Sequence, residues 1–208
     1  MSDLANDLRA ALGATPDPEF TMELPPGWAR HAPDQATQQQ MLAGIKTRMM
    51  QAHRPDLFAQ AQSMLKDSFE SMRRGDVVAF FSATEQGDDT LWLPASILAS
   101  VRRAQTDVTL DEVVRHAILE YDATALDDAK RIVRFERDAL ETVQDEQVRV
   151  LTVVYLTPIP GTQRRRALQL TATISRPVDM EADDPAIDAQ RLLFDACVST
   201  LRWLRPAR

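Results

Sequence analysis

The hydrophobic positions along the chain repeat with two different periods, which predict a mixture of strands and helices. Apolar and polar residues alternate at 19–24, the pattern of a half-buried strand. Two prolines and a glycine end this pattern at 25–27. From about 34 to 74 the apolar residues instead recur every three or four positions, as in amphipathic helices. Pro55 divides this stretch into two helices, which form either an antiparallel pair or one kinked rod.

The middle of the chain contains one strand, one ambiguous segment and one clearly delimited helix. A β-branched and aromatic run predicts a strand at 77–83. The apolar spacing at 91–101 is compatible with strand or helix, and Pro94 favours a strand that is interrupted at an edge. Thr109 followed by Glu112 has the spacing of a capping box, so we expect a helix from 110 to about 121.

Three strand-like stretches and a final helix complete the pattern. The strands are expected at 131–140, 147–158 and 166–175, and the turn at 159–161 joins the last two as an antiparallel hairpin. Pro185 opens the final helix, whose apolar face is expected to extend to Leu201 and Leu204. The order of elements predicts an α+β protein with an antiparallel sheet flanked by helices.

We expect one α+β domain over 19–208. Residues 1–18 form a leader helix and linker, and residues 35–74 form a helical insert in the domain. A chain of 208 residues is long enough for one continuous core and short for two domains.

Charge and cysteine content narrow the classes of partner. Acidic residues outnumber Lys and Arg by 31 to 24, so no general basic face for nucleic acid is expected. The single cysteine permits no intrachain disulfide and fits a reducing compartment. No apolar run is long enough to cross a membrane, and none at the N-terminus fits a signal peptide. We therefore expect a cytoplasmic protein without a membrane span.

The residues that commonly carry out chemistry are few and dispersed. The three histidines, His31, His53 and His116, lack the spacing of a metal site. Cys197 lies in an apolar stretch, where a cysteine behaves as a small hydrophobic residue. No glycine-rich phosphate-binding motif occurs. We expect no enzyme activity, no cofactor and no metal.

Two groups of side chains are candidates for binding a protein partner. Methionine adapts to varied apolar partners, and five of the eight methionines lie in the helical stretch. The candidates there are Met41, Met49, Met64, Phe69 and Met72; the alternative is that they form core or the seam between the two helices. A second group, Arg164, Arg165 and Arg166, lies at the predicted hairpin tip. It is either a solubilising edge or a dock for an acidic partner.

Three segments resemble the Mog1/PsbP-like superfamily. They are FTMELPPGWARH at 20–31, VLTVVYLTPIPGTQRRRALQLTATIS at 150–175 and FDACVSTLRWL at 194–204. The resemblance implies an α/β/α sandwich, from which the helical pair at 35–74 departs as an insert. Members of the superfamily are mostly non-catalytic: photosystem accessory proteins, a small-GTPase release factor, lipoproteins and secretion chaperones.

These observations favour a non-catalytic adaptor or chaperone-like protein with a protein partner, and the resemblance makes an association with secretion one version of that role. One alternative is an assembly subunit that forms a homo-oligomer. Another is a small-ligand-binding protein or enzyme with a pocket near Trp28, Trp92 and Tyr155.

Overall fold

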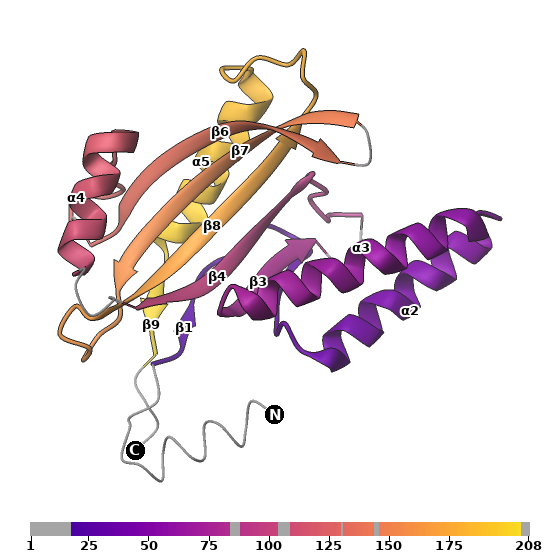
Figure 1. The fold of residues 1–208 in the computed structure, drawn as a ribbon, viewed down its shortest axis with the longest axis horizontal. Helices are drawn as coiled ribbons and strands as arrows, with labels where there is room; N and C mark the ends of the chain where they lie inside the picture. The colour runs from indigo at the N-terminus through magenta and orange to yellow at the C-terminus, as the bar shows by residue number, and fades with distance from the viewer. Residues whose placement is uncertain (1–17, 84–87, 104–108, 130, 144–145, 205–208) are drawn as a thin grey trace, which may run out of the picture.

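A seven-stranded antiparallel sheet forms the centre of the protein (Figure 1). The computed structural model describes residues 18–83, 88–103, 109–129, 131–143 and 146–204. The strand order is β2-β3-β4-β8-β7-β6-β5. The strands are β2 (Trp28–His31), β3 (Val77–Ala83), β4 (Ala95–Arg103), β5 (Thr124–Ala125), β6 (Val133–Val143), β7 (Glu146–Pro158) and β8 (Arg166–Arg176). The predicted leader helix lies outside the described residues.

Two short strands form a second, separate ladder. β1 (Phe20–Thr21) pairs antiparallel with β9 (Arg202–Trp203), so the two ends of the described chain meet. The ring of Phe20 packs edge-on against that of Trp203, with centroids 6.0 Å apart.

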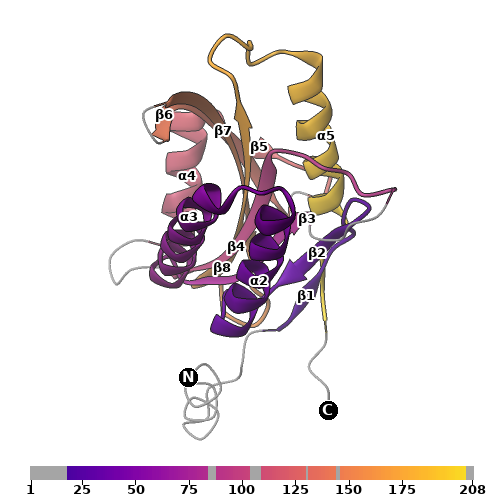
Figure 2. The ribbon, with the colours of Figure 1, turned by 90° about the vertical axis from the view of Figure 1, so that its right-hand side faces the viewer.

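Helices cover both faces of the large sheet, as Figure 2 shows. α5 (Pro185–Ser199) lies on one face, while α3 (Pro55–Arg74) and α4 (Leu110–Tyr121) lie on the other. α2 (Gln35–Gln51) packs against α3 as its antiparallel partner. The α+β class and the helix-flanked antiparallel sheet predicted from the sequence are confirmed. None of the helices in the described ranges combines the length and apolar character needed to cross a membrane.

The helices begin where the sequence supplies a cap. Asp34 accepts a hydrogen bond from the Thr37 backbone N–H at the start of α2 (2.8 Å). Thr109 and Glu112 form the predicted capping box of α4 in both directions. Asp184 caps α5, whose first residue is Pro185, and Pro55 opens α3 in the same position.

The main core lies between the sheet and α5. Ile97, Val153, Leu170 and Ala172 point from the central strands toward Phe194 of α5, and all five side chains are almost fully buried. Burial of a large apolar side chain contributes about 1.5–3 kcal/mol, so this layer dominates the stability of the fold.

Two predicted boundaries were wrong. The strand expected at 19–24 is paired only at Phe20–Thr21. The last helix ends at Ser199 rather than continuing through Leu201 and Leu204, because the next residues extend to pair with β1. The Thr200 hydroxyl also donates to the Cys197 carbonyl (2.6 Å), which satisfies one of the helix's terminal acceptors.

The ambiguous segment at 91–101 contains a strand. β4 starts at Ala95, directly after Pro94. A proline cannot donate a ladder hydrogen bond, but the Pro94 carbonyl accepts one from the Ser175 N–H (3.1 Å).

Candidate functional site

The sheet face opposite α5 is covered by two separate apolar clusters. One contains Phe69 and Met72 of α3 with Phe80 of β3. The other contains Ala117 of α4 with Phe135 and its neighbours on β6 and β7. Residues that are directly opposite one another in an antiparallel ladder share a face. The row Phe135, Val154, Thr171, Leu98 and Phe80 therefore runs from one cluster to the other.

The residues between the two clusters are polar. We call them the polar strip; Thr171 lies in the row just described, and the others lie in rows parallel to it. The polar strip consists of Ser96, Ser100 and Arg102 of β4, Thr152 of β7, Arg137 of β6, and Gln169, Thr171 and Thr173 of β8. The two arginines are exposed and the other side chains are half-buried. An antiparallel sheet commonly leaves part of one face to solvent, and here that part is the middle.

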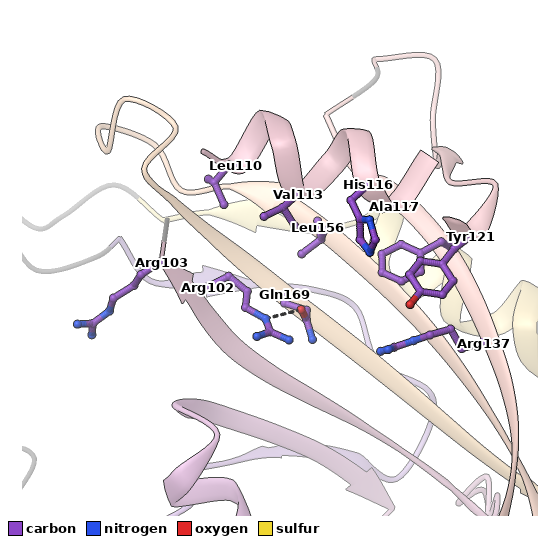
Figure 3. A pocket seen from close by; sticks show the side chains of 11 residues that line it. Arg102, Arg103, Leu110, Val113, His116, Ala117, Tyr121, Arg137, Leu156 and Gln169 are labelled. Carbon is purple, nitrogen blue, oxygen red and sulfur yellow. Dashed lines mark hydrogen bonds between the residues drawn. The ribbon is translucent and has the colours of Figure 1, made fainter. Parts of the chain in front are cut away.

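A pocket of about 370 Å³ lies where the polar strip meets α4 (Figure 3). Its apolar lining comes from Leu110, Val113 and Ala117 of α4 and Leu156 of β7. Its polar lining includes Arg102, Gln169, Arg137 and His116. Arg103 also borders the pocket, but its side chain extends away from the others.

Arg137 is positioned by aromatic rings at one end of the pocket. The rings of Tyr121 and Phe135 are stacked, with centroids 5.3 Å apart and an interplanar angle of 16°. The Arg137 guanidinium carbon lies 5.5 Å from the Tyr121 centroid and 5.9 Å from the Phe135 centroid, within reach of a cation–π interaction. His116 meets Tyr121 edge-on at 6.1 Å.

Arg102 is held by a short chain of hydrogen bonds at the other end. Its Nε donates to Gln169 Oε1 (2.7 Å), which is drawn as the dashed line in Figure 3. The Gln169 amide in turn donates to the Thr171 hydroxyl (3.0 Å). Thr171 therefore orients Gln169, and Gln169 orients Arg102.

The charges of these two arginines are not neutralised within the described part of the chain, where no carboxylate pairs with Arg102 or Arg137. The arginines on the α5 side differ. Arg134 pairs with Asp195, and Arg176 pairs with Asp138 at 2.7 Å. The chain has a formal charge of −7, but the two arginines make the polar strip locally positive. A negatively charged group would therefore be attracted to the strip.

On the other face of the sheet, a partly buried network of polar side chains joins α5 to β6 and β7. Asp195 of α5 accepts hydrogen bonds from the Tyr155 hydroxyl (2.7 Å) and from Arg134 Nε (2.8 Å). Arg134 also contacts Glu136, which pairs with Arg191 of α5 at 3.2 Å. Burial, followed by the hydrogen bond to Asp195, raises the pKa of Tyr155, so this hydroxyl stays protonated and donates.

The predicted methionine surface is divided by the structure. Phe69 and Met72 are buried against Phe80, whereas Met64 is 45% exposed. Met41 and Met49 are half-buried, and Met41 packs on the same cluster as Phe69. Phe69 and Met72 therefore belong to the core, as the alternative to a binding role holds. A binding role for Met41, Met49 and Met64 stays a prediction.

The three consecutive arginines lie at the hairpin between β7 and β8, as expected. Arg164 pairs with Asp111 of α4 at 3.1 Å, and Arg165 is exposed. Arg166 is half-buried at the start of β8. The docking role of this group also stays a prediction.

The remaining candidate chemistry is not brought together. His116 is in the pocket, while Cys197 is buried on α5, where burial raises the pKa of its thiol. Trp28 and Tyr155 are buried in the main core and Trp92 is 55% exposed, so these three do not line the pocket. Within the described ranges, no three histidine, cysteine or acidic side chains gather in a way that could hold a metal ion.

Sequence reasoning missed Arg102, Arg137 and Gln169. The alternation of polar and apolar residues in β8 indicates that one face of this strand is solvated. It does not say which strands lie beside β8. Arg102 and Arg137 belong to different strands, and only the order β4-β8-β7-β6 places them around one pocket.

Comparison with known proteins gives only distant structural likenesses. No family model matches the chain, and no curated protein does. A solved structure from Bacteroides thetaiotaomicron VPI-5482 is 10% identical with a TM-score of 0.43; the alignment covers 91% of this chain and 46% of that one, so this chain spans about half its length. A mutant of the protein Mog1 is 13% identical with a TM-score of 0.42, over 62% of this chain and 80% of the other.

Proposed function

We propose that this protein is a non-catalytic adaptor or chaperone-like protein that binds an acidic segment of a partner protein on the polar strip. The observation that carries the proposal is the pair of arginines, Arg102 and Arg137, which are oriented by neighbouring side chains while their charges remain available. A guanidinium group binds carboxylates through several N–H donors in a fixed plane. Side chains that are already oriented lose less conformational freedom on binding.

A protein segment suits the polar strip better than a compact ligand. The strip crosses four strands, and its serine, threonine and glutamine side chains offer donors and acceptors along that path. The strands that carry the polar strip are held rigid because the main core packs against their opposite face. An extended chain can use such a series of polar groups, whereas a small molecule would fill only the pocket.

Binding rather than catalysis is supported by the surroundings of His116. Its ring contacts Tyr121, and the described residues that line the pocket are arginine, glutamine, aromatic and apolar, with no carboxylate among them to act as its partner. We also propose that the protein acts in the cytoplasm, where a single buried thiol remains reduced.

Peptide selection on the full-length protein tests this function. A phage-displayed library of random peptides would be selected on the immobilised protein, and one enriched peptide would be synthesised with a fluorescein label. We expect enriched peptides to be acidic. The double variant R102Q/R137Q should weaken binding of the labelled peptide by about tenfold or more, measured by fluorescence anisotropy.

The matched control is R115Q, which removes an exposed arginine of α4 that does not line the pocket. It should leave the affinity within about twofold of the original protein. The proposal is overturned if no peptide is enriched above uncoated beads, if the enriched peptides lack acidic residues, or if R115Q and R102Q/R137Q weaken binding equally.

A further inference from the structure

We propose that the pocket beside α4 selects a segment in which an apolar side chain lies between two acidic residues. The apolar side chain would enter the pocket, and the two carboxylates would bind Arg102 and Arg137 separately. This inference rests on the proposed function and specifies which acidic segments the protein accepts.

The first step is the separation of the two arginines. Arg102 is opposite Ala167, while Arg137 is in the row of Thr152, Thr173 and Ser96. Three strand spacings of about 4.8 Å separate β4 from β6, and six residues separate Arg102 from Ser96 along β4, which adds about 20 Å. Arg102 and Arg137 therefore reach the pocket from opposite ends, so two acidic groups can bind them separately.

The second step is the apolar lining between them. Leu110 and Ala117 of α4 are buried, and Leu156 of β7 is 6% exposed, so these three side chains give the pocket an apolar wall. Val113 is half-buried at the same wall. A pocket of about 370 Å³ accommodates one large aliphatic or aromatic side chain.

The third step combines charge and shape. An acidic segment without an apolar residue would leave the pocket wall in contact with water, and an apolar segment without acids would leave both guanidinium groups without their strongest partners. A segment with both features satisfies the whole lining. Selectivity therefore comes from two arginines at opposite ends of a pocket that also has an apolar wall on its α4 side.

Double-mutant cycles between protein and peptide test the inference. The enriched fluorescein peptide would be made in three versions, with the apolar residue changed to alanine or with either acidic residue changed to its amide. We expect R102Q to lose its effect, about three- to tenfold, against one amide version, and R137Q to lose its effect against the other.

The pocket wall is tested by V113Q, with V114Q as its matched control, because Val114 is the adjacent half-buried valine of α4 and does not line the pocket. V113Q should weaken the original peptide by about tenfold and the alanine version by less than twofold, while V114Q affects both equally. Circular dichroism checks that each variant is folded, and V113A replaces V113Q if it is not.

Three results separate the inference from the proposed function. If both arginines couple to the same acidic residue, or if V113Q or its replacement weakens the original peptide no more than V114Q does, the inference is wrong while acidic-segment binding stands. If no peptide is enriched at all, the proposed function fails and the inference falls with it.

Discussion

At the scale of single residues, burial decides which side chains are available for chemistry. Cys197 is 7% exposed on the face of α5 that packs against the sheet. Burial is the main cause that raises the pKa of its thiol, so the nucleophilic thiolate form is disfavoured as well as covered. A lone cysteine in this setting contributes packing rather than reactivity.

This burial predicts a slow reaction with a thiol reagent. At pH 8 the native protein should react with dithionitrobenzoate at least about a hundredfold more slowly than the protein in denaturant, because reaction requires the helix to open. The absorbance of the released thionitrobenzoate measures both rates. An equally fast reaction in the native state would show that the thiol is accessible and that α5 is not packed as described.

At the scale of elements, α5 is attached to the sheet by polar as well as apolar contacts. Asp195 joins α5 to Tyr155 of β7 and to Arg134 of β6. Replacing the tyrosine by phenylalanine keeps the buried ring and removes one hydrogen bond to a charged acceptor. Such a bond is worth about 1.5–3 kcal/mol.

We therefore expect Y155F to lower the free energy of unfolding by about 1.5–3 kcal/mol in urea titration. D195N should lower it by at least as much, because Arg134 would lose one of its two charged partners while still partly buried. The double variant Y155F/D195N should lose less than the sum of the two single changes, since both alter one interaction. Strictly additive losses would show that the hydroxyl and the carboxylate act independently.

Local sequence signals predicted the bounds of some elements accurately and missed others. The capping box predicted α4 within its observed bounds, and the hairpin of β7 and β8 was found because its turn and its alternation are local. β2 and β9 were missed because each is short and is defined by a distant partner: Trp28 pairs with Ala83, and Trp203 with Phe20. Short strands carry too little periodicity to be recognised without the partner strand.

At the scale of the whole molecule, the candidate site depends on strand order. The sequence predicted the antiparallel sheet and its helices, but β4 and β8 are neighbours although α4 and three other strands separate them in the chain. That crossover places Arg102 beside Gln169. The methionines of α2 and α3 were prominent in the sequence because they are close together there, yet the polar strip is assembled from residues far apart in the sequence.

The helix pair α2 and α3 joins the rest of the molecule at one end. Phe69 and Met72 near the end of α3 pack on Phe80, and Met41 and Leu65 extend that cluster. The antiparallel arrangement puts Gln51 and Pro55 at the opposite end of the pair. No residue of α2 is fully buried. The part of the pair beyond Met41 and Leu65 should therefore contribute little to the stability of the sheet.

A shortened chain tests whether the pair behaves as an insert. Replacing residues 45–61 by a short Gly-Ser linker keeps all the side chains that pack on Phe80, so the melting temperature should change by less than about 4 °C, or about 1 kcal/mol. Deleting 35–74 should cost far more, because Phe80 would lose the buried contacts of Phe69 and Met72. Far- and near-ultraviolet circular dichroism would follow both variants. If the first variant unfolds, the outer part of the pair is integral to the domain, because the cluster on Phe80 alone would then be insufficient to hold α3 on the sheet.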